Sequence, residues 1–171
     1  MQMVKKIFIA LFIAWFGLLL FMPKQEIYYM LEKELEKKEI KINEKSMEEG
    51  LFSLTLKQAS VYVKGIPIAT IEELRFFTML FYTKVELETL LLDDSLKAMA
   101  PQQTDKATLS HSLITPLSAS IHAEGSFGGI EGNIDLKERK LHLDFNETKE
   151  IEMIRSQLKK DEKGWYYETS F

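Results

Sequence analysis

The strongest constraint on the fold is the alternation of apolar and polar residues from 121 to 145, IHAEGSFGGIEGNIDLKERKLHLDF. A two-residue turn at Gly128 and Gly129 aligns two strands in the pairs Phe127 with Ile130, Gly125 with Gly132, Ala123 with Ile134, and Ile121 with Leu136. A second turn centred on Glu138 and Arg139 gives the pairs Leu136 with Leu141, Ile134 with Leu143, and Gly132 with Phe145. Both turns place the apolar residues on one face, and a slip of one residue would mix the faces. The stretch therefore predicts an antiparallel meander with one apolar side.

The glycines of this stretch do not form a phosphate-binding loop. Gly125, Gly128, Gly129 and Gly132 have neither the offsets of a dinucleotide-binding fingerprint nor the Lys-Ser/Thr that ends a P-loop. The residues after Gly132 alternate as strands and do not open a helix. We therefore interpret these glycines as turn and packing residues of a sheet.

The polar side of the predicted meander offers one candidate metal site. The predicted register aligns His122, Asp135 and His142 across three strands, and the row beside them is Glu124, Asn133 and Asp144. Two imidazoles and a carboxylate are metal-ligand types, and directly paired residues lie close enough to converge. An antiparallel sheet normally has one solvated face, however, and opposite charges across strands are common there. We favour the solvated face and predict no metal ion and no other cofactor.

Alternation or β-branched and aromatic content predicts further strands at 40–42, 51–63, 66–76, 81–92 and 107–113. Within 51–63 the apolar set shifts from Phe52, Leu54 and Leu56 to Ala59, Val61 and Val63. A shift of face inside one strand indicates a β-bulge or bend near Gln58. The chain is therefore predicted to be mainly β, with a curved antiparallel sheet.

The N-terminus carries an uninterrupted apolar run from Ile7 to Met22, preceded by Lys5 and Lys6. The run nears the length of a membrane span, and residues 21–24, FMPK, lack the small pair of a signal-peptide cleavage site. Residues 1–23 are therefore predicted to be a transmembrane helix that is retained as an anchor. The two lysines favour a cytoplasmic N-terminus, which places the β-rich domain 24–171 outside the cytoplasmic membrane.

Two further helices are predicted. Ile27, Leu31 and Leu35 recur every four residues in an amphipathic juxtamembrane helix over 23–38. Such a helix either lies on the membrane or a partner, or packs its apolar stripe on the domain, which we favour. A short C-terminal helix follows Asn146, with Ile154 and Leu158 on one side, and GWYYETSF predicts a final strand.

Composition excludes several classes of function. The 171 residues suit one folded domain, and a net charge of −4 without a dense basic stripe gives no footprint for nucleic acid. The chain has no cysteine, which excludes a disulfide or a thiolate nucleophile. It also lacks a G-x-S-x-G motif, so we expect no enzymatic activity.

The order of these parts resembles a known family. An anchor, a short helix, the strands GLFSLTLKQASVYVKG and IATIEELRF, and then GSFGGIEGNIDL and KLHLDF are similar to the GspN family of type II secretion and, more distantly, to AsmA-like and LptC-like envelope proteins. The resemblance implies a bacterial inner-membrane anchor and a periplasmic antiparallel β domain. In these families an apolar sheet face holds lipid acyl chains or continues into the sheet of a partner.

These observations predict a non-enzymatic envelope protein that binds lipid or an envelope partner through its apolar sheet face. The alternative is a structural or assembly subunit of a type II secretion-like complex that binds protein only. The pattern leaves open whether the face is a groove or a closed core. The residues predicted to form it are Phe52, Leu54, Leu56, Ile121, Ala123, Phe127, Ile130, Ile134, Leu136, Leu141, Leu143 and Phe145.

Overall fold

A computed structural model describes residues 2–20, 24–79, 81–96, 101–146, 154–162 and 164–171. These residues form two α-helices, two short 3₁₀ helices and one antiparallel sheet of eleven strands. The helices are α1 (Gln2–Leu20) and α2 (Lys24–Glu36), and the 3₁₀ turns span Asp94–Leu96 and Arg155–Gln157. The strands are β1 (Ile40–Asn43), β2 (Ser46–Glu49), β3 (Ser53–Val63), β4 (Ile66–Met79), β5 (Tyr82–Leu92), β6 (Gln103–Ser112), β7 (Ser118–Gly125), β8 (Gly128–Asp135), β9 (Lys140–Phe145), β10 (Lys159–Lys160) and β11 (Trp165–Ser170).

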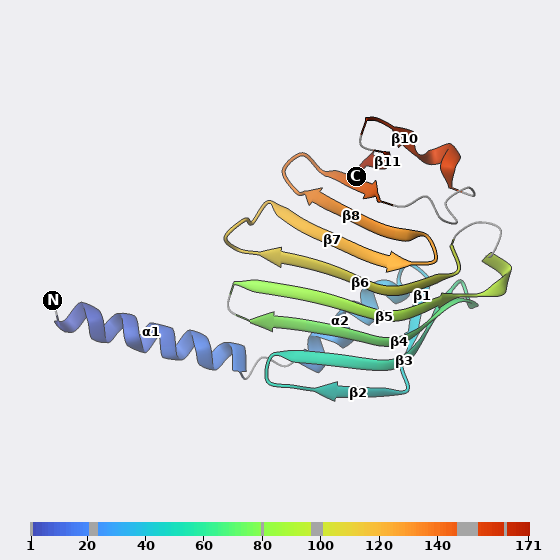
Figure 1. Cartoon of the computed structure of the whole chain (residues 1–171). Coiled ribbons are helices and arrows are strands. Elements are labelled where there is room, and N and C mark those ends of the chain that lie inside the picture. Colours follow the sequence, from blue (N-terminus) through green and yellow to red (C-terminus); the bar gives the residue numbers. More distant parts are fainter. Residues whose placement is uncertain (1, 21–23, 80, 97–100, 147–153, 163) are drawn as a thin grey trace.

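From β3 to β9 the sheet is a meander in which neighbours along the chain are neighbours in space (Figure 1). Its order is β1-β3-β4-β5-β6-β7-β8-β9-β11-β10, and β2 also pairs with β3. The mainly β class and the antiparallel sheet predicted from the sequence are confirmed. All five strands predicted before residue 114 are present, with ends that differ by a few residues.

The two N-terminal helices differ in their surroundings. α1 extends away from one end of the sheet, whereas α2 lies behind the sheet in Figure 1. α2 confirms the predicted helix, and it packs on the domain. The residue buried against Leu54 and Leu56 is Tyr28, however, whereas Ile27 and Leu31 of the predicted stripe are exposed. In the portion of the chain described, no helix combines the length and the apolar character required to cross a membrane.

A crease crosses the sheet at the position where the sequence predicts a bend. Gln58 in β3 and Thr89 in β5 both have positive φ, at 50° and 49°. The inward-facing pairs change there from Leu56 with Leu74 to Ala59 with Ile71. β2 pairs with β3 before the crease and β1 pairs after it, and β1 lies behind the sheet with α2 (Figure 1). The bend therefore turns the sheet toward the side that α2 covers.

The predicted pairing of β7 with β8 is wrong. Gly125 pairs with Gly128 and Ala123 with Ile130, so the turn consists of Ser126 and Phe127. The predicted turn needs positive φ at both of its central residues, Gly128 and Gly129, but only Gly128 has it, at 90°. This arrangement buries Phe127 in the turn, where its side chain packs against Phe145.

The predicted pairing of β8 with β9 is also wrong, by a smaller shift. Leu141 pairs with Ile134, not with Leu136, and Asp135 pairs with Lys140. The Asp135 carboxylate accepts hydrogen bonds from the backbone N–H groups of Lys137 and Glu138, both at 2.8 Å. These bonds begin the turn one residue after β8 and give a four-residue loop over 136–139.

The predicted C-terminal helix is wrong for the residues that can be compared. Residues 147–153 lie outside the described residues, and Arg155–Gln157 form only one 3₁₀ turn. The next residues form β10, which pairs with β11, the predicted final strand. Ile154 and Leu158 nevertheless pack on Phe127 and Phe145, so their apolar spacing corresponds to burial without a helix.

Gly132 is required by the close approach of β9. A Cβ atom at this position would lie 2.6 Å from the His142 carbonyl oxygen and would also overlap the Leu143 side chain. We therefore expect Gly132→Ala to lower the free energy of unfolding by about 1–3 kcal/mol. Gly129→Ala is the control, because the nearest neighbour of its Cβ, the Asn146 Nδ2, lies at 3.6 Å. Urea unfolding measures both, and equal stability of the two variants would contradict the packing argument.

Candidate apolar binding face

One face of the sheet, here called the inner face, carries an apolar row across eight strands. The register places in this row Leu54, Phe76, Val85, Leu109, Ile121, Gly132, Leu143 and Tyr167. A second row beside it contains Leu56, Leu74, Leu87, Ala107, Ala123, Ile130, Phe145 and Trp165. Because side chains alternate between faces, both rows point to the same side. The inner face is thus continuous from β3 to β11.

The structure brings most of the predicted apolar residues together on this face. The members in the two rows or beside them on the same strands are Leu54, Leu56, Ile121, Ala123, Ile130, Ile134, Leu141, Leu143 and Phe145. Phe127 joins them from its turn. Phe52 and Leu136 do not lie in strands. Phe52 precedes β3, and Leu136 follows β8 in an exposed loop.

Each end of the inner face is covered. At the β3 end, Tyr28 of α2 forms a buried cluster with Leu54 and Leu56, and Met47, Leu74 and Phe76 pack around it. At the β9 end, Phe127 and Phe145 are buried beneath the side chains of Ile154, Leu158, Trp165 and Tyr167. Leu56, at 0%, is the least exposed side chain of these two clusters.

The middle of the inner face is more open than its ends. Leu109 of β6 lies in the central row between Val85 and Ile121, yet its side chain is 38% exposed. Val85 and Ile121 are half-buried, whereas Leu56 in the neighbouring row is 0% exposed. Leu109 is therefore an apolar side chain that the described residues leave partly uncovered in the centre of an apolar surface.

An apolar pocket lies between α2 and the edge of this face. It has a volume of about 160 Å³ and is lined by Lys24, Ile27, Tyr28, Leu31, Phe52, Leu54, Phe76 and Thr78. The Tyr28 hydroxyl donates a 2.9 Å hydrogen bond to Glu44. Burial, with this hydrogen bond as a second cause, raises the pKa of Tyr28 far above its ordinary value, so the phenol stays neutral. The pocket thus has uncharged walls apart from Lys24, whose ammonium lies 3.4 Å from the Glu49 carboxylate.

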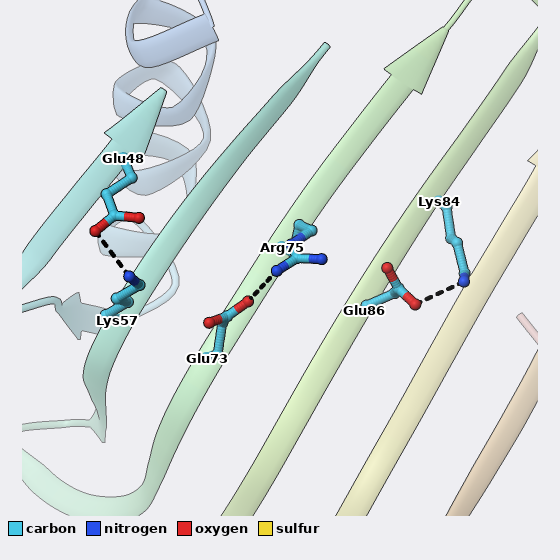
Figure 2. Close-up of polar contacts among 6 residues, drawn as sticks. All are labelled: Glu48, Lys57, Glu73, Arg75, Lys84 and Glu86. Atoms are coloured by element: carbon cyan, nitrogen blue, oxygen red, sulfur yellow. Dashed lines mark hydrogen bonds and ion pairs between the residues drawn. The ribbon is translucent and has the colours of Figure 1, made fainter. Parts of the chain in front are cut away.

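The opposite, outer face carries ion pairs. Figure 2 shows three of them on neighbouring strands: Glu48 with Lys57 at 2.7 Å, and Glu73 with Arg75 and Lys84 with Glu86, both at 2.6 Å. The hydrogen bond from Lys84 lowers the pKa of the Glu86 carboxyl and raises the pKa of the Lys84 ammonium. The sheet therefore has one charged, solvated face and one apolar face, as the alternation predicts.

The predicted row of His122, Asp135 and His142 does not exist, because it depended on the incorrect register. His122 pairs with Glu131, and His142 pairs with Asn133 and Glu168. Each imidazole contacts a carboxylate of its own strand, Glu124 at 3.2 Å and Asp144 at 3.1 Å. Among the described residues, no three His, Asp or Glu side chains are arranged to hold a metal ion.

Several inner-face residues were not among those predicted from the sequence. They are Met47, Leu74, Phe76, Val85, Leu87, Leu109, Trp165 and Tyr167. Their strands were predicted from the sequence, except for β2. The predicted residue pairs, however, covered only the stretch 121–145. Alternation through 69–76 and 85–92, with the change of face at the crease, would have found four of them: Leu74, Phe76, Val85 and Leu87.

Comparisons of the chain with protein-family models, with curated proteins and with solved structures found no match.

Proposed function

We propose that this protein is a non-enzymatic, single-pass protein of the bacterial envelope whose inner face binds lipid acyl chains. The observation that carries the proposal is the partly uncovered Leu109 in the centre of a continuous apolar face. An acyl chain laid along this face would cover exposed apolar surface, which is favourable by about 25 cal/mol per Å².

The small pocket fits this proposal as one end of a longer binding surface. Its volume of about 160 Å³ is close to that of cavities that hold one benzene-sized molecule, roughly 150 Å³. It therefore accommodates a few methylene groups, and the rest of an acyl chain would lie on the open face beyond Phe76.

The anchor is part of the same proposal. The apolar run from Ile7 to Met22 extends beyond the described end of α1, and it is flanked by lysines that are suited to the membrane interface. In this arrangement residues 1–23 span the inner membrane with the N-terminus in the cytoplasm. The domain 24–171 then lies in the periplasm.

The alternative, a secretion subunit that binds protein only, is less well supported by the sheet edges. A partner that continues the sheet would pair with β1 or β2 at one edge, and with β10 or the uncovered part of β11 at the other. β1 contains Lys41, β2 carries Glu48 and Glu49, and β10 consists of Lys159 and Lys160. Short, charged edge strands oppose the addition of another strand. We therefore propose lipid as the ligand.

Replacing Leu109 by glutamate tests the proposal. We expect Leu109→Glu to fold, because a partly exposed strand position tolerates the change at a cost of less than about 1 kcal/mol. An unpaired carboxylate against an acyl chain costs at least about 2 kcal/mol, so bound lipid should fall roughly tenfold or more. Native mass spectrometry of the full-length protein, extracted in detergent, measures the lipid carried by each variant.

The matched control is Ser110→Glu, one residue along the same strand on the outer face, where the new carboxylate lies opposite Lys84. This variant should keep its lipid. Unchanged lipid in folded Leu109→Glu, or no lipid in the original protein, would refute lipid binding on the inner face.

A further inference from the structure

The turns at one end of the sheet form a continuous apolar rim. Alternate turns of the meander lie at the end from which α1 extends (Figure 1). We call this end the α1-side rim. It consists of residues 50–52, 79, 81–82, 113–117, 136–139 and the C-terminal Phe171. The large apolar side chains exposed on it are Leu51, Met79, Phe81, Tyr82, Leu113, Ile114, Leu117, Leu136 and Phe171.

Backbone hydrogen bonds join these turns to one another. The N–H of Leu113 donates to the Phe81 carbonyl at 2.7 Å, and the N–H of Leu136 donates to the Leu117 carbonyl at 2.9 Å. Phe171 donates in the same way to Arg139 at 3.0 Å. The exposed apolar side chains therefore belong to adjacent, connected turns and are not scattered, and such a continuous exposed patch indicates a contact surface.

The turns at the other end, the far rim, have a different chemistry. In the described residues, the far rim has Lys64, Gly65, Asp93, Asp94, Asp161 and Glu162 in its turns, with Ile66 and Leu91 as exposed apolar side chains. The α1-side rim instead adds Lys137, Glu138 and Arg139 to its apolar side chains. One rim is thus mainly apolar, and the other is largely acidic. This contrast suits an anionic, hydrocarbon-rich surface at only one of them.

The helix α1 meets the sheet at the apolar rim. Trp15 of α1 lies against Phe81, with ring centroids 5.4 Å apart, and Phe16 lies against Phe52 at 6.2 Å. The apolar surface of the helix is therefore continuous with the apolar surface of the turns. If α1 is embedded in a bilayer, as in the proposed function on which this step rests, these contacts place the rim beside the second half of the apolar run from Ile7 to Met22.

We propose that the α1-side rim docks into the membrane surface, with its apolar turns reaching through the headgroup layer to the acyl chains, so that the inner face opens directly to the bilayer. The occupant is a phospholipid surface with anionic lipid. Aromatic side chains such as Phe81 and Tyr82 and cations such as Arg139 are the residues that favour this layer. The pocket beside Phe52 and Thr78 lies at the same rim, so an acyl chain reaches it without crossing water.

Site-directed spin labels on the full-length protein test this arrangement, and the absence of natural cysteines makes single labels unambiguous. The rim variant is Ile114→Cys, at a side chain that is 84% exposed. The far-rim control is Lys64→Cys, and the anchor control is Phe12→Cys. Each protein is reconstituted in vesicles of phosphatidylethanolamine and phosphatidylglycerol. The measured quantity is the ratio of label collisions with oxygen, which enters the lipid, to collisions with a water-soluble nickel complex.

We expect this ratio at Ile114 to be several-fold higher than at Lys64 and to approach the ratio at Phe12. Equal ratios at Ile114 and Lys64, with Phe12 in lipid, would overturn the docked rim and leave the anchor intact. A Phe12 label in water would overturn the anchor and the docked rim together. The lipid content of Leu109→Glu tests lipid binding by the inner face separately. Failure of that proposal and failure of the docked rim therefore give different results.

Discussion

Leu56→Asp is expected to leave the protein without a cooperatively folded domain. Leu56 is 0% exposed and is the centre of the cluster that joins α2 to the sheet. Burial of an unpaired carboxylate costs several kcal/mol, which is comparable to the roughly 5–15 kcal/mol that stabilises a typical domain. Circular dichroism should show loss of the strand signal and of a sharp thermal transition.

Leu56→Ala and Leu51→Asp complete this experiment. The alanine variant should fold but lose about 2–5 kcal/mol of unfolding free energy, because it leaves a cavity. Leu51→Asp, at a side chain that is 70% exposed, should retain the stability of the original protein. A stable, folded Leu56→Asp protein would show that the α2 cluster is not the core of the domain.

Introducing two lysines into the apolar run of α1 is expected to abolish retention of the protein in membranes. Ile9 and Ile13 are exposed on α1, one turn apart. A lysine near the centre of a spanning helix costs roughly 2.5–3.5 kcal/mol, so Ile9→Lys with Ile13→Lys removes most of the drive for insertion. The original protein should stay in the membrane pellet after washing with alkaline carbonate, and the double variant should appear in the supernatant.

Met3→Lys is the control for this change, because it adds a cation outside the run, beside Lys5 and Lys6. It should stay in the pellet. Extraction of the original protein by carbonate, or a soluble form that begins near residue 23, would show that residues 1–23 are not a retained anchor.

The sequence was sufficient to predict the faces of the sheet but not the register. Ala123 pairs with Ile130 in place of the predicted Ile134, and Leu141 pairs with Ile134 in place of Leu136. Both errors shift the partner by an even number of residues. Alternation with period two is unchanged by such a shift, so it fixes which side chains share a face and leaves the partners open.

The register depends on local turn chemistry and tertiary packing, which the alternation of apolar and polar residues does not predict. The burial of Phe127 and the hydrogen bonds to Asp135 select the turns, and neither follows from alternation. The predicted alignment of His122 with His142 was wrong for the same reason, since it depended on partners and not on faces. The bend at Gln58 was predictable because a change of face within one strand is local information.

The meander also determines how the sheet of such a protein can become longer or shorter in evolution. Each strand pairs mainly with its neighbours along the chain, so one hairpin is a unit that can be inserted or removed without altering the rest. Strands are spaced by about 4.8 Å, and one added hairpin lengthens the apolar face by roughly 10 Å. It also contributes one turn to each rim. Gain or loss of hairpins would therefore adjust the reach of the domain from its anchor while keeping the same turns toward α1.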